Sequence, residues 1–385
     1  MNEALIVEAV RSPIGKKNGT LAGTRADDLA AMVLAGLVER SGVDKDAIED
    51  VVMGCVTQIG EQGFNIGRTA SLIAGLPVET AATSVNRMCA SSLQTTNFQA
   101  QAIMSGQLDV GIAAGVEVMS RTQMGSDNNN VGMSEKLTDQ YAIIPQGFSA
   151  EMIAEQWKLS REELDEYSYN SHQRAVKAQE AGYFDAEILP LKVTKFDGEE
   201  VTFDRDETPR GTTTLEKMGT LNPAFKPDGV VTAGNSSQIS DGSAALLMMS
   251  GDAAAKHGLK ARARVISTAL SGVDPTIMLT GNPTAMKKAL DRVGLTLGDM
   301  DVIEVNEAFA TVALQTLKDL GLEDRMDDFN PNGGGISLGH PLGASGARIL
   351  TSLVNELERR DARYGIASMC IGFGMACATV VERVK

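Results

Sequence analysis

Residues 330–385 read NPNGGGISLGHPLGASGARILTSLVNELERRDARYGIASMCIGFGMACATVVERVK, and this stretch decides the fold. Three glycines at 333–335 predict a tight backbone path, because glycine lets the chain approach other groups closely. His340 follows within the loop GHPLG, and an amphipathic helix is predicted directly after it. A strand, Tyr364–Met369, then leads to Cys370 and a sharp glycine turn. A histidine and a cysteine on glycine-framed loops indicate a site, although each taken alone could be a packing residue in a turn.

The overall composition limits the class of protein. At 385 residues the chain is long enough for two or three folding units. It has 43% hydrophobic residues, 39 glycines and only 4% aromatic residues, which indicates an α/β protein whose glycines form the turns between strands and helices. The net charge of −15 argues against binding to nucleic acid and to anionic membrane surfaces.

The cysteines and the start of the chain indicate a compartment. None of the four cysteines forms a CxxC pair, so we expect no structural zinc and no other metal. The N-terminus reads as a strand rather than as a signal peptide, and no apolar run reaches the roughly 18 residues that span a bilayer. We therefore expect a soluble, cytoplasmic protein with reduced thiols and no membrane span.

The two halves of the chain carry the same order of predicted elements: strand, helix, strand, helix, strand, helix, strand. An offset of 254 places residues 89–91 (CAS) on residues 343–345 (GAS). This repetition predicts an internal duplication, although chance similarity between segments rich in alanine and glycine is the alternative. The two copies should face each other with Cys89 and His340 on equivalent strand-to-helix turns, where open α/β sheets bind ligands.

The predicted domains follow from this duplication. Residues 1–116 together with 231–260 form the N-terminal half, and residues 261–385 form the C-terminal half. Between them, residues 117–230 are polar and loop-rich, which indicates an inserted loop domain that covers the site. A capping box at Ser160 opens the long helix expected within this insertion.

Four residues are candidates for chemistry. Cys89 follows a strand and begins a helix, whose free N–H groups and dipole stabilise a thiolate, so it is the best nucleophile. A nucleophilic cysteine needs a base, and His340 is the histidine in a glycine-framed loop, whereas His172 reads as a packed or solvated residue. Cys370 follows a buried strand and is a candidate second acid or base. Asn306 interrupts an apolar run, which indicates oriented hydrogen bonds or, alternatively, a turn.

Four motifs, in this order and spacing, resemble those of the thiolase family. Residues 85–92 (VNRMCASS) are similar to its nucleophile motif, and residues 306–309 (NEAF) match its NEAF motif. Residues 333–343 (GGGISLGHPLG) resemble its GGxxxxGHPxG motif, and residues 370–372 (CIG) resemble its CxG motif. The resemblance extends over the whole chain.

This resemblance implies the thiolase fold, a duplicated αβαβα core of five layers with an inserted loop domain. It implies that Cys89 carries the acyl group, that His340 activates it, and that Cys370 exchanges a proton with the α-carbon of the acetyl-CoA unit. The backbone N–H groups of Cys89 and Gly372 would form one oxyanion hole. His340 and a water molecule held by Asn306 would form the other.

The resemblance also implies ligands and partners. Coenzyme A and acyl-CoA are the expected substrates, with no permanently bound cofactor. Ser237 and Phe309 would line the channel for the pantetheine arm, and Arg210 would lie near the nucleotide end of coenzyme A. The family implies a homodimer or homotetramer, and association with other beta-oxidation enzymes is possible. The polar excursion at Arg121–Thr138 is a candidate contributor to assembly.

Some residues depart from the family pattern. Phe373 stands where many members have glycine, and Ala376 replaces another common glycine, so the shape of the pocket differs although no reacting group is lost. Residues 145–147 read PQG, where thiolases that form acetoacetyl-CoA usually have HMG, which favours a degradative enzyme. Residues 10–16 and 54–58 resemble thiolases of actinobacterial fatty-acid and sterol side-chain breakdown.

The leading functional prediction is a degradative 3-ketoacyl-CoA thiolase. Such an enzyme cleaves 3-ketoacyl-CoA with coenzyme A into acetyl-CoA and a shortened acyl-CoA through an acyl-Cys89 intermediate. Cleavage expels a carbanion equivalent and therefore needs an oxyanion hole, a proton donor and a covalent acyl carrier. The alternatives are a biosynthetic acetoacetyl-CoA thiolase and a non-catalytic acyl-CoA-binding protein of thiolase fold. A ketosynthase is a weaker alternative because Cys370 has no place in its usual catalytic sets.

Overall fold

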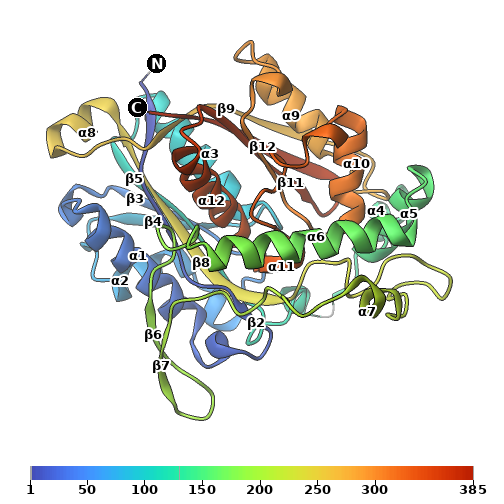
Figure 1. The fold of residues 1–385 in the computed structure, drawn as a ribbon. Helices are drawn as coiled ribbons and strands as arrows, with labels where there is room; N and C mark the ends of the chain where they lie inside the picture. The colour runs from blue at the N-terminus through green and yellow to red at the C-terminus, as the bar shows by residue number, and fades with distance from the viewer. Residues whose placement is uncertain (1, 130, 385) are drawn as a thin grey trace.

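The computed structural model describes residues 2–129 and 131–384, and these residues build one ten-stranded mixed sheet (Figure 1). The strand order is β10–β11–β12–β9–β1–β8–β5–β3–β4, with the short β2 paired to β8. The strands are β1 Ala4–Arg11, β2 Gly15–Lys16, β3 Asp50–Gly54, β4 Ala81–Val85, β5 Val110–Val118, β8 Ser240–Ser250, β9 Ala263–Gly272, β10 Val302–Val305, β11 Tyr364–Ile371 and β12 Met375–Arg383.

The sheet consists of two half-sheets that meet where β1 pairs antiparallel with β9 over residues 4–6. In the first half, β5 pairs parallel with β3 and antiparallel with β8; in the second half, β11 pairs parallel with β10 and antiparallel with β12. The offset of 254 carries the first residue of α3, Ser91, onto the first residue of α12, Ser345. It also carries Val110, where β5 begins, onto Tyr364, where β11 begins. The structure therefore contains the duplicated order of elements that the sequence predicts.

Helices divide the molecule into five layers. Helices α3 (Ser91–Met104) and α12 (Ser345–Arg359) lie side by side between the half-sheets, and each contacts strands of both (Figure 1). Helices α1 (Ala26–Ser41) and α2 (Ile66–Ile73) cover the outer face of the first half-sheet. Helix α9 (Asn282–Asp291) and the adjoining α10 (Ala310–Leu320) cover that of the second. This is the predicted αβαβα arrangement, and it explains why β5 and β8 are buried along their whole length.

The crossing of α3 and α12 requires a glycine. A Cβ atom on Gly346 would lie 2.1 Å from the backbone nitrogen of Leu93, so the two helices approach backbone to backbone. Cys89 lies just before α3, and His340 lies just before α12. The close crossing therefore brings the N-termini of both helices together. Helix α8 (Gly251–His257) lies after β8, away from this centre (Figure 1).

The chain between β5 and β8 forms the inserted segment. It contains α4 (Glu135–Thr138), α5 (Gln146–Gln156), α6 (Arg161–Glu180), the hairpin β6 (Leu191–Thr194) with β7 (Glu200–Phe203), and α7 (Leu215–Gly219). Its α5 and α6 pack on α10 of the second half. The predicted capping box is present, with Ser160 Oγ accepting from Glu163 N–H at 3.1 Å and the Glu163 carboxylate accepting from Ser160 N–H at 2.7 Å. Residue 130, within the predicted polar excursion, lies outside the described residues.

Two local predictions were wrong, and the division into domains stays a prediction. The sequence predicts a strand at Thr83–Met88 that leads into Cys89. The strand is Ala81–Val85 instead, because the chain leaves the sheet to form the turn before α3. The sequence TRAD at residues 24–27 predicts an N-cap at Thr24. Arg25 occupies that position instead, without a side-chain cap, and its guanidinium pairs with Asp27 at 2.8 Å. The sequence also predicts that Gly42 ends this helix, and Gly42 does end α1, at φ 68°.

Candidate active site

Cys89 lies on a strained turn between β4 and α3. Met88, directly before it, has φ 45°, a left-handed conformation that costs a non-glycine residue about 1–2 kcal/mol. Side chains hold the turn: Asn86 Oδ1 accepts from the Met88 N–H at 2.8 Å, and Ser91 Oγ donates to the Met88 carbonyl at 2.6 Å. The same Ser91 hydroxyl accepts from the Arg87 N–H at 3.0 Å. Cys89 is thereby presented at the start of the helix while only 4% exposed.

Three donor groups act to lower the pKa of the Cys89 thiol and so favour its thiolate. They are its own backbone N–H, the N–H of Gly372 and the side-chain amide of Gln146. Burial outweighs these donors and raises the pKa of the Cys89 thiol to about 11, and the negative charge of Glu117 acts in the same direction. The resting thiol is therefore protonated near neutral pH, and its activation requires a base.

His340 lies in the loop between α11 (Gly335–Leu338) and α12 and is held at both ring nitrogens. Its Nδ1 is 2.5 Å from Ser345 Oγ, and that hydroxyl donates its proton to the Pro341 carbonyl at 2.9 Å. Since the hydroxyl has only one proton, Nδ1 carries the imidazole hydrogen and Nε2 carries the lone pair. Asn306 Nδ2 lies 3.2 Å from Nε2. Burial lowers the pKa of His340 to about 3, and the charge of Arg348 adds to this, so the ring is neutral.

The His340 loop lies against the Cys89 turn. A Cβ on Gly115 of β5 would meet the Gly343 carbonyl at 2.2 Å and Ser92 Cβ at 2.5 Å, so both segments approach the same point of the sheet. The Ser92 hydroxyl also accepts from the Ala347 N–H at 2.9 Å. The structure therefore brings together two predicted residues that are 251 positions apart.

Cys370 and Gly372 reach the site from the β11–β12 hairpin. Cys370 is fully buried near the end of β11, and burial raises the pKa of its thiol, with the nearby Cys89 as a second cause. A Cβ on Gly372 would lie 2.8 Å from Met88 Sδ, so this glycine allows the hairpin to approach the Cys89 turn. Phe373, in the turn, has φ 61°, which explains why glycine suits this position.

Asn306 is positioned by its neighbour Glu307. The buried Glu307 carboxylate accepts from the Tyr167 hydroxyl at 2.8 Å and from Ser171 Oγ at 2.7 Å, both on α6. It also accepts from the Ile336 N–H at 3.2 Å. A Cβ on Gly334 would lie 2.5 Å from Glu307 Cδ, so the run of glycines lets the loop close over this carboxylate. The inserted segment and the His340 loop are thus joined through one side chain.

A cavity of about 210 Å³ opens beside these loops. It is lined by His172, Arg210, Thr213, Lys217, Met218, Leu221, Ala233, Gly234, Gln238 and Ile336. Arg210 Nη2 donates to Gln238 Oε1 at 3.2 Å, and its backbone N–H donates to His172 Nδ1 at 3.1 Å. Ser237 and Phe309 are not among the lining residues. Ser237 directly precedes the lining residue Gln238, and its N–H donates to the carbonyl of Ala308, the neighbour of Phe309, at 3.0 Å. His172 is buried, as the packed alternative predicted.

Comparison with known proteins identifies the family. The family models described as "Thiolase, N-terminal domain" and "Thiolase, C-terminal domain" match residues 4–252 and 259–383. The chain belongs to the thiolase family. It is therefore an enzyme, an acyltransferase, as predicted.

Individual relatives of this thiolase carry different names. A beta-ketoadipyl-CoA thiolase of Acinetobacter baylyi is 46% identical, with all of both chains covered. A 3-ketoacyl-CoA thiolase of Aliivibrio fischeri is 48% identical over the full length of both. The crystal structure of the Bacillus anthracis acetyl-CoA acetyltransferase matches with a TM-score of 0.92 and 39% identity, covering 100% of this chain and 99% of the other. The thiolase fold is thus confirmed, while the substrate is not determined by these names.

Sequence reasoning missed two buried residues that support the site of this thiolase. Glu117 accepts from the Val56 and Gly343 N–H groups, both at 2.9 Å, and so ties the His340 loop to the end of β3. The sequence feature that could have identified Glu117 is a lone carboxylate within the apolar strand β5. Ser345, which selects the tautomer of His340, gave no such signal because serine is common at helix starts.

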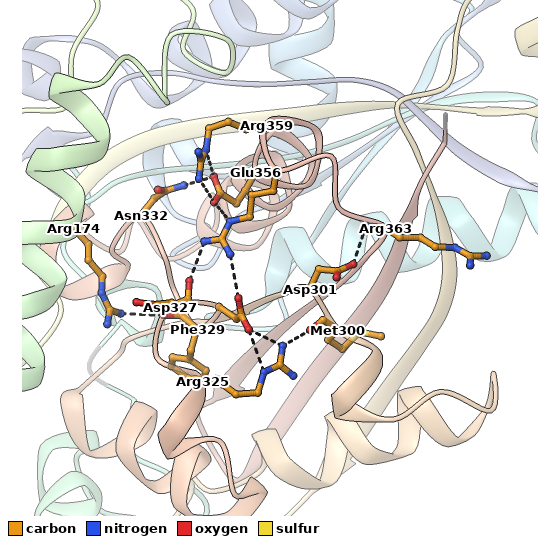
Figure 2. Close-up of polar contacts among 12 residues, drawn as sticks. Arg174, Met300, Asp301, Arg325, Asp327, Phe329, Asn332, Glu356, Arg359 and Arg363 are labelled. Carbon is orange, nitrogen blue, oxygen red and sulfur yellow. Dashed lines mark hydrogen bonds and ion pairs between the residues drawn. The ribbon is translucent and has the colours of Figure 1, made fainter.

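The NPNGGG loop of the thiolase is also held from its outer side (Figure 2). Asn332 Nδ2 donates to the Glu356 carboxylate at 2.9 Å, and Arg359 and Arg360 bind the same carboxylate. Arg174 of α6 donates to the Phe329 carbonyl at 3.0 Å. These contacts anchor both ends of the segment that leads into the glycine run.

The described part of the chain offers neither a metal-binding cluster nor a helix that could cross a membrane. Residues 2–129 and 131–384 contain no group of three or more His, Cys, Asp or Glu side chains arranged to hold a metal ion. No helix in that same part of the chain has both the length and the apolar character that crossing a membrane requires.

Proposed function

We propose that this thiolase is a degradative 3-ketoacyl-CoA thiolase. It would cleave a 3-ketoacyl-CoA with coenzyme A into acetyl-CoA and an acyl-CoA shortened by two carbons. The observation that carries the proposal is the arrangement around Cys89: donors on its sulfur, a second buried thiol near it, and a neutral histidine in the adjoining loop. The name of the Aliivibrio fischeri relative supports the degradative direction.

In the first half-reaction, Cys89 Sγ attacks the 3-keto carbon as its proton moves to His340 Nε2. The 3-keto oxygen becomes an oxyanion that accepts hydrogen bonds from the N–H groups of Cys89 and Gly372. The bond between C2 and C3 then breaks, the oxyanion returns to a carbonyl, and the acyl group remains on Cys89 as a thioester. The departing C2 carbanion takes the proton of Cys370, which releases acetyl-CoA and leaves Cys370 as a thiolate.

In the second half-reaction, coenzyme A enters and gives its thiol proton to the Cys370 thiolate. Its sulfur attacks the thioester carbonyl, and the bond from that carbon to Cys89 Sγ breaks. The Cys89 thiolate then regains its proton from the His340 imidazolium. Because the resting thiol and imidazole are both neutral, the first proton moves only as the sulfur attacks its carbonyl, and every group returns to its starting state.

The polar contacts of coenzyme A are part of the proposal. Arg210 and Lys217 bring positive charge to the cavity of about 210 Å³, which suits the phosphates of the nucleotide end. Ser237 and Phe309 stay predicted contacts of the pantetheine arm. A beta-ketoadipyl-CoA substrate is a specific form of the same reaction, supported by the name of the Acinetobacter baylyi relative.

The alternative is biosynthetic condensation of two acetyl-CoA molecules. The likeness to the Bacillus anthracis acetyl-CoA acetyltransferase supports it, since that structure covers the whole chain. The same residues could catalyse the reverse reaction, so the direction depends on the acyl chain that is accepted and on metabolite levels.

A thiolysis panel tests the proposal. Wild type and Cys89→Ala are assayed with coenzyme A and 3-ketoacyl-CoA substrates that include acetoacetyl-CoA, medium and long chains, a sterol-derived chain and beta-ketoadipyl-CoA. We expect turnover of longer or substituted chains, lost in the variant. Turnover of acetoacetyl-CoA alone would favour the biosynthetic alternative, and coenzyme A binding without any turnover would favour a non-catalytic protein.

The remaining predictions about cellular context are proposals as well. A cytoplasmic location, a homodimer or homotetramer, and association with other beta-oxidation enzymes all stay predictions for this chain.

A further inference from the structure

Gln146 has a polar side chain close to the reacting centre at Cys89, and the proposed mechanism does not use it. It is the first residue of α5 and is half-buried. Its Nε2 lies 3.3 Å from the point where a Cβ on Gly372 would stand, next to Met88 Sδ at 2.8 Å from the same point. The Gly372 N–H and the Gln146 amide both act to lower the pKa of the Cys89 thiol, so both favour its thiolate. Gln146 therefore flanks the backbone donor that the proposed mechanism uses.

The backbone of α5 is held rigidly at this end. A Cβ on Gly147 would lie 2.1 Å from the ring of Phe225, so the helix start rests directly on that ring. Phe225 packs edge-to-face on Phe309 of the NEAF motif, with ring centroids 6.0 Å apart. Farther along α5, the Glu151 carboxylate accepts from the Val231 N–H at 2.9 Å. These contacts fix the start of α5 relative to the catalytic loops, and therefore the reach of the Gln146 side chain.

The surroundings of the Cys89 sulfur give the Gln146 amide a chemical task. The charged forms of Glu117 and Cys370 disfavour a Cys89 thiolate, as does burial. The other two groups that favour the thiolate are backbone N–H groups, which no substitution other than proline removes. A side-chain amide supplies a donor without a charge, so it stabilises the thiolate without attracting a second anion.

We propose that Gln146 is a catalytic residue of this thiolase, whose amide donates to the Cys89 sulfur when it becomes a thiolate and to the adjoining oxyanion when the sulfur attacks the substrate. No bond to Gln146 forms or breaks, and its amide gives up no proton. The second part of this role rests on the proposed thiolysis, whereas the first part requires only the free enzyme.

The test compares Gln146→Met with wild type. Methionine keeps the length of the side chain and removes the donor. The free enzyme is treated with iodoacetamide between pH 6 and 10, and mass spectrometry of the peptide that contains Cys89 gives the alkylation rate. A hydrogen bond to a charged group predicts that the variant reacts about tenfold more slowly near pH 8, with its pH profile shifted to higher pH. A wild-type rate and profile in the variant would overturn the proposal.

Two further variants make the result specific. Gln156→Met changes an exposed glutamine at the other end of α5 and should react like wild type. Gln146→Glu places a carboxylate beside the sulfur, so its alkylation profile should shift to higher pH than that of Gln146→Met. Equal profiles for the Glu and Met variants would mean that residue 146 does not face the thiolate, and would also contradict the proposal. Circular dichroism of each variant checks the fold.

Thiolysis kinetics then test the second part of the role. With the substrate that the wild type turns over best, Gln146→Met should lower kcat by about tenfold and leave KM for coenzyme A unchanged. A fall in kcat/KM through KM alone would assign Gln146 to substrate binding and contradict a role in the oxyanion. If the wild type cleaves no 3-ketoacyl-CoA, the proposed function fails, and the alkylation profiles still decide whether Gln146 serves the thiolate.

Discussion

At the scale of single residues, the site depends on neutral groups held in defined orientations. The imidazole of His340 is neutral because it is buried near Arg348, and Ser345 selects its tautomer. The thiol of Cys89 is neutral because burial outweighs its three hydrogen-bond donors. A site of this kind activates its nucleophile only when a substrate accepts the developing charge.

Replacing Ser345 by alanine tests the tautomer. Without the Ser345 hydroxyl, the hydrogen on Nδ1 loses this acceptor. The ring can then carry that hydrogen on Nε2 instead, and Nε2 no longer accepts a proton from Cys89. We expect kcat to fall about 10- to 100-fold with little change in KM, as for other residues that orient a functional histidine. Steady-state thiolysis measures this, and 15N NMR of the imidazole reports the tautomer.

The matched control lies on the same helix. Thr351 Oγ1 is buried without a hydrogen-bond partner, so Thr351→Val keeps the shape and should retain wild-type kcat. If Ser345→Ala keeps full activity and the Nδ1–H tautomer, the assignment from the Ser345 hydrogen bonds is wrong.

Two buried histidines make the protein sensitive to acid. Burial lowers the pKa of His340 to about 3 and that of His172 to about 4, both below the ordinary value of 6.5. Below pH 6.5 the unfolded chain binds protons that the folded chain does not, so stability is full above that pH and falls towards pH 4. Each histidine contributes a slope of up to about 1.4 kcal/mol per pH unit.

Urea unfolding at pH 7, 6 and 5 measures this slope. His172→Asn should reduce it by about half of the histidine contribution. A slope that is the same in wild type and His172→Asn would contradict the prediction.

At the scale of elements, the site is built where two helices and one hairpin converge. Helices α3 and α12 cross at Gly346, and the β11–β12 hairpin carries Cys370 and Gly372 to the start of α3. The convergence depends on glycine positions, such as Gly346 and Gly372, where a side chain would clash with a neighbouring element.

Substituting Gly346 by valine should therefore destabilise the whole fold. The added atoms would meet the backbone of Leu93 at 2.1 Å, and neither helix can shift without moving its end of the site. We expect a loss of about 3 kcal/mol or more in the free energy of unfolding, measured by urea titration.

Gly219 provides the comparison, because a Cβ there meets no atom within 4 Å and Gly219→Ala should be close to neutral. A Gly346→Val protein as stable as Gly219→Ala would show that the crossing is not as close as described.

At the scale of the whole molecule, one side of the first half-sheet is left open. β4 is its edge strand, and apolar residues on and beside the neighbouring α2 are exposed, including Phe64 at 99% and Val78 at 70%. An exposed edge with apolar side chains favours association with another chain.

The predicted homo-oligomer should form through this side. Phe64→Asp with Val78→Asp should lower the solution mass measured by light scattering to that of one chain. Leu215→Asp, at the exposed start of α7, serves as the control and should keep the wild-type mass. An unchanged mass in the double variant would place the interface elsewhere, for example at the predicted Arg121–Thr138 excursion.

Much of the fold could be predicted from the sequence because its signals are local. The offset of 254 identified the duplicated order of elements from the sequence alone, and α3 and α12 do begin at equivalent positions. The boundary of β4 and the cap of α1 were missed, because the turn at Met88 and the Arg25–Asp27 pair depend on contacts that no local pattern encodes.

The sequence by itself determined which residue types the site contains: Cys89, His340, Cys370 and Asn306 stand in motifs that are recognisable without a structure. Only the tertiary structure decided how these groups are charged and oriented. Burial sets the protonation of Cys89 and His340, Ser345 selects a tautomer, and α5 carries Gln146 to Gly372 from another part of the chain. The physical reason is that desolvation and hydrogen bonding act through space, between residues whose separation along the chain carries no information about their distance.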